Sequence, residues 1–354
     1  MFNKIKIRKG QPDPKLNEME FHEEFKKDFY DPRFRDLDHE IEKLTQIAWE
    51  NYNDHRKSPI TEKAGLQFQD PEFDLSTEWL ITRNKLLVAK EAQKTSQSRI
   101  LIINASPRSE HTCPGEMSKS YRLLERAKKV IESRGVQADI LDLSRLTSGY
   151  KKIIYPCKAC VSTAMPLCHW PCSCYPNHSL GQNHDCMNEI YEQWISAHGI
   201  MIITPVHWYQ TPSPLKLMMD RLVCADGGNP DPTTTHGKNP EEAKKIEMKG
   251  WDFPKHLEGR AFSVVVHGDS AGLEDTRRSL IDWLTDLHLV QAGVASSYVG
   301  YFGTYAESHN ELDKNEDFLI EVESAAESLI KQIELIRNHE YVNPNSEFTH
   351  PMQK

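Results

Sequence analysis

The sequence has no excess of basic residues and no long apolar run. Its 354 residues include 43 Lys and Arg against 52 Asp and Glu, which gives a formal net charge of −9. Binding of a nucleic-acid backbone requires a basic surface, so this balance argues against a nucleic-acid partner. No apolar run approaches the roughly 20 residues that cross a bilayer, and the opening MFNKIKIRKGQPDPK lacks the apolar core of a secretory signal. We therefore predict a cytoplasmic protein without a membrane partner.

Two common glycine-rich phosphate-binding patterns are also missing. The first strand-like segment is not followed by G-x-G-x-x-G, which argues against a dinucleotide fingerprint. The same loop lacks the Lys-Ser/Thr pair that ends a P-loop, which argues against an NTPase. The sequence also shows no recognisable acid–base triad.

From residue 99 onward, short apolar runs alternate with amphipathic segments. Apolar runs bounded by turn residues suit strands that are buried on both faces of a parallel sheet. Alternation of such runs with helices indicates a doubly wound α/β fold. The predicted strands are 99–105, 138–143, a weaker 153–155, 199–204, 261–266 and 297–302, and the predicted helices include 117–134, 187–197 and 316–338.

Residues 1–98 differ from the rest because they contain no strand-like run. Leu37, Ile41, Leu44 and Ala48 recur at helical spacing, and a second helix is predicted over 77–92. We predict a helical N-terminal extension (1–98), one main domain (99–340) and a loose C-terminal tail (341–354). The apolar stripe is expected to pack on the main domain or on a second subunit.

The first predicted strand runs into Asn104-Ala-Ser-Pro-Arg-Ser109. Ligands of open α/β sheets bind where the strands end at their carboxyl edge. Hydroxyls, a guanidinium and a helix N-terminus at this point suit a phosphate monoester. The alternative for Ser106 and Arg108 is an ordinary surface turn.

A second polar loop, Thr204-Pro-Val-His-Trp-Tyr-Gln210, follows the strand expected beside the first one. Two adjacent aromatic residues among prolines favour a loop that binds a planar ring. The alternative for Trp208 and Tyr209 is ordinary packing.

Taken together, three loops resemble those of a known family. Ser106-Pro107-Arg108, Pro156-Cys-Lys-Ala-Cys160 and Thr204-Pro-Val-His-Trp208, which leads to Asp220-Arg221, closely resemble the flavodoxin-like NAD(P)H-dependent FMN reductases. That superfamily includes quinone reductases and iron-sulfur flavoproteins. The resemblance covers about 99–335. It implies a flavodoxin-like five-stranded parallel sheet in the order 2-1-3-4-5, preceded here by the helical extension.

The resemblance also implies a cofactor and the residues that hold it. Ser106 and Arg108 would bind the FMN phosphate, with Ser118 and Ser120 as later hydroxyls beyond an insertion over 109–117. The flavin ring would lie against Pro205, Val206, His207, Trp208 and Tyr209, with Gly268 as a further contact. NAD(P)H would reduce FMN, which would pass electrons to a small acceptor: a quinone, a flavin, a nitro or azo compound, or a metal ion. The resemblance further implies a homodimer or a higher homo-oligomer.

Six of the eight cysteines lie between residues 157 and 186. In a cytosolic chain such density suggests metal or redox chemistry before disulfides. Cys157, Cys160, Cys168 and Cys172 are the candidate ligands of either a [4Fe–4S] cluster or zinc. The alternative is a loop of packed, reduced cysteines. Two other functions therefore stay open: an iron-sulfur flavoprotein that carries electrons, and a non-catalytic module that senses metal or redox state.

Overall fold

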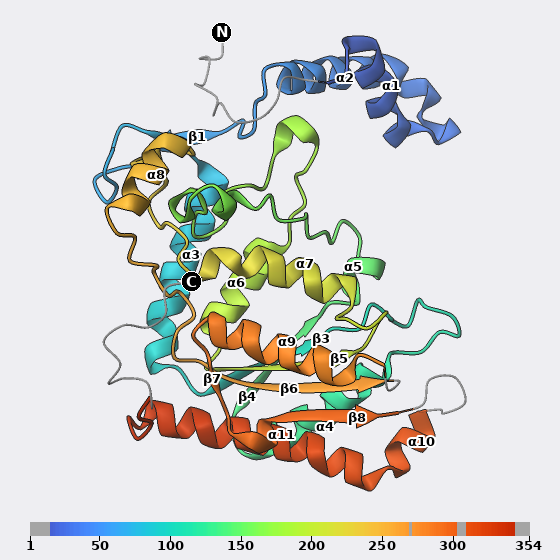
Figure 1. Ribbon diagram of the computed structural model, residues 1–354. Helices are drawn as coiled ribbons and strands as arrows, with labels where there is room; N and C mark the ends of the chain where they lie inside the picture. Colours follow the sequence, from blue (N-terminus) through green and yellow to red (C-terminus); the bar gives the residue numbers. More distant parts are fainter. Residues whose placement is uncertain (1–14, 269–270, 303–308, 344–354) are drawn as a thin grey trace. The chain divides into compact units, whose positions relative to one another are not determined.

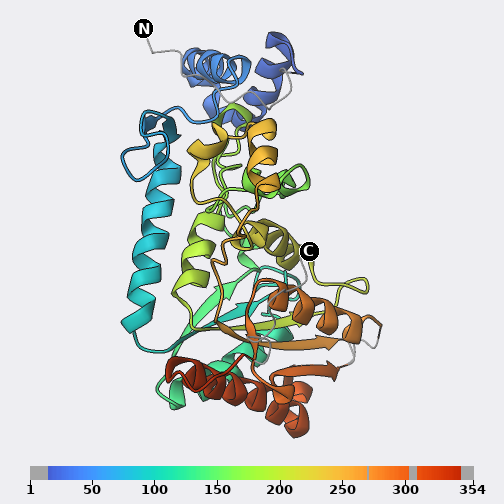
Figure 2. The same cartoon turned by 60° about the vertical axis from the view of Figure 1, so that its left-hand side comes forward.

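The computed structural model describes residues 15–268, 271–302 and 309–343, and the predicted tail lies almost wholly outside them. The chain divides into two compact units (Figure 1). The first unit comprises 1–84, 155–185 and 227–254, and the second comprises 85–154, 186–226 and 255–354. These units do not follow the boundary that we expected at residue 98, because two later segments associate with the N-terminal residues. Helix α3 (Thr77–Thr95) begins in the first unit and ends in the second (Figure 2).

The second unit contains a six-stranded parallel sheet. Its strands run in the order β4 (Gln137–Asp142), β3 (Arg99–Asn104), β5 (Gly199–Pro205) and β6 (Ala261–Gly268). Beside β6 lie both β7 (Val290–Gln291) and β8 (Ser297–Tyr301). The predicted doubly wound parallel sheet is confirmed. The number of strands was wrong, because two strands lie where we expected a single last one.

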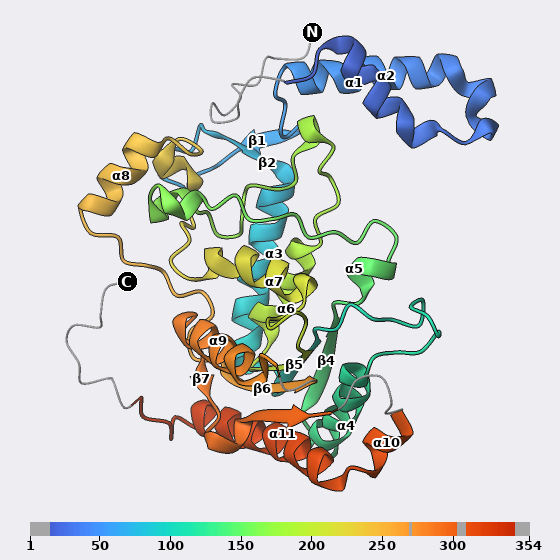
Figure 3. The same cartoon turned by 45° about the vertical axis from the view of Figure 1, so that its right-hand side comes forward.

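Helices cover both faces of this sheet (Figure 3). On one face, α4 (Lys119–Ser133) and α11 (Glu316–Arg337) pack on alternate residues of the strands. On the other lie α6 (Met187–Ser196), α7 (Ser213–Arg221) and α9 (Leu273–Asp286). Because side chains alternate across a strand, coverage of both faces explains why the central strands are continuous apolar runs. Shorter helical elements of this unit are α5 (Arg145–Ser148), α10 (His309–Lys314) and the 3-10 turns Leu222–Ala225 and Val294–Ser296.

The weak strand predicted over 153–155 is not part of the sheet. The Ile153 carbonyl accepts a hydrogen bond from the Cys186 backbone N–H (2.9 Å), and no strand is formed there. A strand of three residues is stable only when it pairs with a neighbouring strand. Residues 153–155 are not part of any strand of this sheet. The cysteine-rich segment therefore lies between α5 and α6, and the strand that follows it is β5.

The first unit is built from short elements. It contains α1 (Glu18–Lys26), α2 (Asp38–Asn53), an antiparallel pair β1 (Thr61–Lys63) and β2 (Asp74–Ser76), and α8 (Pro240–Met248). Its 3-10 turns are Lys27–Phe29, Pro32–Leu37, Cys160–Ser162, Met165–Leu167, His178–Leu180 and Pro232–Thr235. Among the described residues, no helix of either unit has the length and apolar character to cross a bilayer.

The apolar stripe predicted on α2 is only partly buried. Ile41 is 7% exposed, whereas Leu37 and Leu44 are 46% and 50% exposed. Helix α2 meets α1 through aromatic rings instead, with the centroids of Phe21 and Tyr52 4.8 Å apart. The buried face of α2 is thus rotated away from the predicted stripe, which leaves apolar side chains at the surface.

Candidate functional site

The carboxyl ends of the central strands place the predicted site residues at one edge of the sheet. In the parallel register Asn104 lies beside Ile203, and Pro205 lies beside His267. The loops that leave β3, β5 and β6 therefore start from the same edge, as the topology of open α/β sheets requires. The structure brings together the segments that carry Ser106, Pro205–Tyr209 and Gly268.

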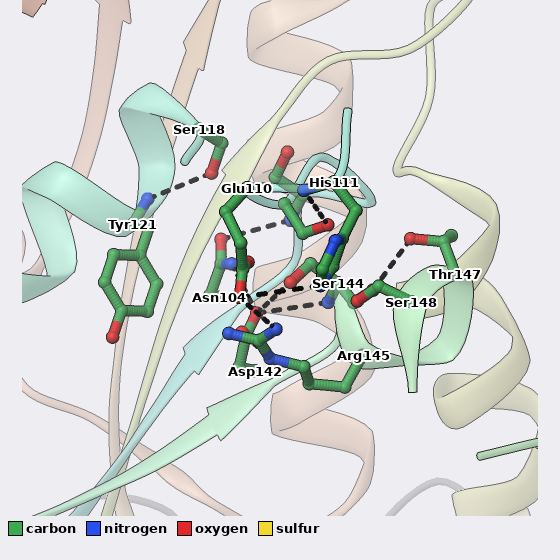
Figure 4. A network of polar contacts seen from close by, with 12 residues as sticks. Asn104, Glu110, His111, Ser118, Tyr121, Asp142, Ser144, Arg145, Thr147 and Ser148 are labelled. Carbon is green, nitrogen blue, oxygen red and sulfur yellow. Dashed lines mark hydrogen bonds and ion pairs between the residues drawn. The ribbon is translucent and has the colours of Figure 1, made fainter. Parts of the chain in front are cut away.

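A buried polar network holds the start of the first loop. The Asn104 side-chain amide donates to Asp142 Oδ1 (2.7 Å), and its Oδ1 accepts from the Ser106 backbone N–H (3.3 Å). Ser144 donates its hydroxyl to the same carboxylate oxygen (2.7 Å), as Figure 4 shows. Thr147 donates its hydroxyl to the Pro107 carbonyl (2.8 Å). The loop after β3 is thus tied to the turn after β4, which the sequence did not reveal because the partners are about forty residues apart.

The Arg108 side chain forms hydrogen bonds with the insertion 109–117 that follows it. Its guanidinium donates to the carbonyls of Cys113 (3.1 Å) and Glu116 (3.3 Å), and it lies 3.8 Å from the Glu116 carboxylate. Its backbone N–H donates to the Ser106 hydroxyl (3.2 Å). The predicted pair Ser106 and Arg108 is therefore in contact, and part of the guanidinium is engaged within the loop.

The two later serines have different surroundings. Ser118 caps α4, because its hydroxyl accepts from the Tyr121 backbone N–H (3.1 Å). Ser120 is fully buried, and its hydroxyl lies 2.7 Å from His267 Nε2. Burial, with smaller contributions from the nearby Lys119 and His207, lowers the pKa of His267 to about 3. His267 is therefore neutral at pH 7, and the sequence analysis gave it no role of its own.

The aromatic loop is a tight turn in an unusual conformation. His207 and Gln210 exchange backbone hydrogen bonds of 2.8 and 3.0 Å. Between them Trp208 and Tyr209 have φ angles of 48° and 68°, and their exposed fractions are 93% and 64%. Two positive φ angles are typical of a type I′ turn, which Asn and Gly normally form. Large aromatic residues here carry backbone strain of the kind that concentrates at ligand sites.

Gly272 permits a close approach of its chain segment to this turn, and Gly268 lies nearby with a positive φ angle. Gly272 has a φ of +83°, and a Cβ there would lie 2.5 Å from the Cα of Tyr209. Gly268 has a φ of +141°, and a Cβ there would lie 3.6 Å from the Val206 backbone nitrogen. Gly272 was not among the predicted site residues. The close approach that requires it comes from tertiary contact alone.

The groups around the start of α4 have the chemistry of an anion site. The hydroxyls of Ser106 and Ser118, the Arg108 guanidinium and the N-terminus of a 15-residue helix belong to the same loop. Backbone N–H groups and the helix dipole at such a terminus favour a phosphate. Together with the aromatic turn, this donor set suits a ligand that carries one phosphate and one planar ring.

Comparison with known proteins decides the family. The family of NADPH-dependent FMN reductases matches residues 98–303. The chain belongs to this family. The predicted resemblance is therefore confirmed, and the chain is a flavin oxidoreductase whose family uses FMN and NADPH.

Individual relatives are more distant. An iron-sulfur flavoprotein from Methanosarcina thermophila is 26% identical over 211 residues, which are 59% of this chain and 84% of the relative. Among solved structures, RosB with a bound intermediate is 13% identical and covers 73% of this chain and 96% of its own, at a TM-score of 0.47. An FMN-dependent NADH-azoreductase from Bacillus anthracis is 17% identical and covers 66% and 99%, at a TM-score of 0.36.

The four candidate metal ligands do not converge. Among the residues that the structure describes, no group of three or more His, Cys, Asp and Glu side chains is arranged to hold a metal ion. Cys160 lies instead 3.3 Å from Cys174, sulfur to sulfur, and Lys238 Nζ lies 2.8 and 2.9 Å from the two sulfurs. An ammonium group at this point opposes a bound cation. The cysteine segment as observed does not fit a four-thiolate cluster or tetrahedral zinc.

Proposed function

We propose that this chain binds FMN at the carboxyl edge of its sheet, takes reducing equivalents from NAD(P)H and passes them to a small acceptor such as a quinone, a flavin, a nitro or azo compound, or a metal ion. The observation that carries the proposal is the strained aromatic turn His207–Gln210, which leaves the same sheet edge as the phosphate-type donors at the start of α4. FMN, when bound, supplies the two-electron chemistry.

The proposed role of the first loop is to hold the phosphate. Ser106, Ser118 and the N-terminus of α4 would donate hydrogen bonds, and Arg108 would add a positive charge. Ser120 would act indirectly. Its bond to buried His267 fixes the first turn of α4 against the end of β6.

The proposed role of Pro205–Tyr209 and Gly268 is to hold the ring. The exposed side chains of Trp208 and Tyr209 offer apolar surface to a planar ligand. A neutral His267 beneath the turn keeps this buried layer without charge. Backbone groups of the turn would form hydrogen bonds with the polar edge of the ring.

The proposal is tested by identifying and using the cofactor. The full chain is purified, released cofactor is identified by mass, and the apoprotein is titrated with FMN, FAD and riboflavin. We expect FMN to bind best, since the loop offers donors for one phosphate, and we expect NADPH oxidation with a quinone to require FMN. Equal binding of riboflavin and FMN would contradict the phosphate site, and a lack of turnover with every acceptor class would contradict the enzyme.

A second function rests on the relative named an iron-sulfur flavoprotein. An electron carrier of that kind would use Cys157, Cys160, Cys168 and Cys172 as cluster ligands. Among the described residues these side chains form no group that could hold a metal ion, and Lys238 Nζ lies 2.8 Å from the Cys160 sulfur, which argues against this candidate. Iron and sulfide analysis of anaerobically purified protein separates the two proposals, because the reductase requires neither element.

We also propose that the chain forms a homodimer or a higher homo-oligomer through α2. Leu44 and Ile47 on this helix are 50% and 58% exposed, and Leu37, directly before it, is 46% exposed. Apolar side chains that recur at helical spacing on a surface are typical of a contact with another chain.

A further inference from the structure

The first unit contains a close group of two cysteines and one lysine. The sulfur atoms of Cys160 and Cys174 lie 3.3 Å apart, and the ammonium nitrogen of Lys238 is within 2.9 Å of both. Cys174 and its neighbour Cys172 are buried, whereas Cys160 is partly exposed. We infer that Cys160 and Cys174 form a reversible dithiol–disulfide site that reacts with hydrogen peroxide, with Lys238 as the positioned cation.

The fold holds each sulfur from a different segment. Ala159, with a φ of 49°, starts the 3-10 turn of Cys160, which packs against the buried cluster of Ala164, Leu167 and Ala243. Cys174 precedes Tyr175, whose ring stacks on Tyr155 with centroids 5.0 Å apart. Rigid supports on both sides keep the two sulfurs at a distance from which they can form a bond.

Lys238 is also fixed by its local backbone. His236 and Gly237 before it have positive φ angles of 42° and 83°, and Asn239 after it caps α8. A Cβ at Gly237 would lie 3.4 Å from the ring of Phe73, so the turn packs closely there. The ammonium group is therefore directed by a defined turn and a helix cap, unlike a surface lysine on a flexible stretch.

The surroundings favour a thiolate at this point. The ammonium group of Lys238 lies 2.8 and 2.9 Å from the two sulfurs, and a positive charge at that distance stabilises the anionic form of a thiol. The thiolate is the form of cysteine that attacks an oxidant.

Cys160 is partly exposed, so a small oxidant can approach the pair from that side. A cavity of about 370 Å³ in the same unit is lined by Ser173, Tyr175 and Gly237, the sequence neighbours of Cys174 and Lys238. Lys57 and His236 also line it, which gives the cavity a polar wall. Hydrogen peroxide is small and uncharged enough to enter such a space.

The chemistry proceeds in two balanced steps. The Cys174 thiolate attacks one oxygen of hydrogen peroxide, the O–O bond breaks, and hydroxide leaves and takes a proton from solvent, which leaves a sulfenic acid on Cys174. The Cys160 thiol then attacks that sulfur, the S–S bond forms, the S–O bond breaks, and water leaves with the thiol proton. Two thiols lose two electrons and hydrogen peroxide gains them. Two molecules of a small thiol then reduce the disulfide by exchange and become a disulfide themselves.

The test measures the pair in the full-length chain. Reduced protein is treated with one equivalent of hydrogen peroxide, quenched with an alkylating agent and digested for mass spectrometry. We expect two thiols to disappear and a single cross-linked peptide that joins Cys160 to Cys174, both restored by dithiothreitol. Lys238→Met should slow the reaction about 10-fold or more through loss of the positive charge, and Lys238→Arg should retain most of the rate.

Matched variants separate the outcomes. Cys157→Ser, in the same segment but outside the pair, should leave the cross-link intact, whereas Cys160→Ser should leave a sulfenic acid on Cys174. A cross-link between other cysteines, or oxidation without one, would overturn the inference. So would stoichiometric iron or zinc in anaerobic protein that is lost in Cys174→Ser. Whether the original chain forms the Cys160–Cys174 cross-link tests the inference even if a variant fails to fold.

Discussion

Buried beside Ser120, His267 links the stability of the second unit to pH. Its pKa falls from an ordinary 6.5 to about 3 because the ring is buried. Between these values the unfolded chain binds a proton that the folded chain does not. The free energy of unfolding should therefore decrease as the pH falls from 6.5 towards 3, by up to roughly 1.4 kcal/mol per pH unit from this residue. Urea unfolding at a series of pH values measures it.

His267→Gln isolates this contribution, since an amide can still bond to the Ser120 hydroxyl but does not take up a proton. We expect the variant to be less stable than the original chain at pH 7 and to lose less stability on acidification. His39→Gln, on the exposed surface of α2, is the control and should leave the pH dependence unchanged. Parallel curves for the original chain and His267→Gln would refute the assignment.

Arg108 combines a proposed ligand role with an observed role in the loop. Arg108→Ala should weaken FMN binding by roughly 1.5–3 kcal/mol, the range for a hydrogen bond to a charged group. It should also free the carbonyls of Cys113 and Glu116, so the 109–117 insertion should become more sensitive to proteolysis. Fluorescence titration with FMN and with riboflavin separates the two effects. An equal decrease in the affinities for FMN and riboflavin would show that the substitution only disturbs the loop. A decrease confined to the affinity for FMN supports the phosphate contact.

The turn His207–Gln210 depends on the close approach of Gly272. Gly272→Ala would place a methyl group 2.5 Å from the Cα of Tyr209, so the turn must move. Gly181→Ala is a matched control, because that glycine is also left-handed, with φ +65° and ψ 16°, but has no atom within 4 Å of the added methyl group. Both changes should cost about 1 kcal/mol of backbone strain. Only Gly272→Ala should also reduce FMN affinity, and equal affinities in the two variants would argue that the turn does not hold the ring.

Association of whole chains should depend on the exposed face of α2. The double change Leu44→Glu and Ile47→Glu places charges on that face, and we expect it to convert the proposed homo-oligomer to monomers while FMN still binds. Leu66→Glu is the control, because Leu66 is 95% exposed in a loop outside this face. Light scattering after size-exclusion chromatography measures the mass. A monomeric original chain, or an unchanged mass in the double variant, would contradict the proposal.

Local pattern was enough for much of the fold. The runs that became β3, β5 and β6 are apolar throughout because helices cover both faces of the sheet, and the ends of α3, α4 and α11 fall within a few residues of the prediction. Predictions from the sequence pattern were wrong where tertiary contacts, and not the spacing of apolar residues, determined the structure. Residues 153–155 have strand-like composition but no strand beside them, and α2 buries its face towards α1 rather than its most regular apolar stripe.

The sequence by itself determined the parallel α/β sheet, the polar loops at its edge and, through these loops, the family. These features could be predicted because hydrophobic periodicity, helix caps and turn residues act over only a few positions. Only the tertiary structure decided which distant side chains meet. Ser120 and His267 are 147 residues apart, Lys238 and Cys160 are 78 apart, and the strained turn at Trp208 requires Gly272 from another loop. Such partners depend on the path of the whole chain, since burial and close packing, and not local propensity, bring their atoms within bonding distance.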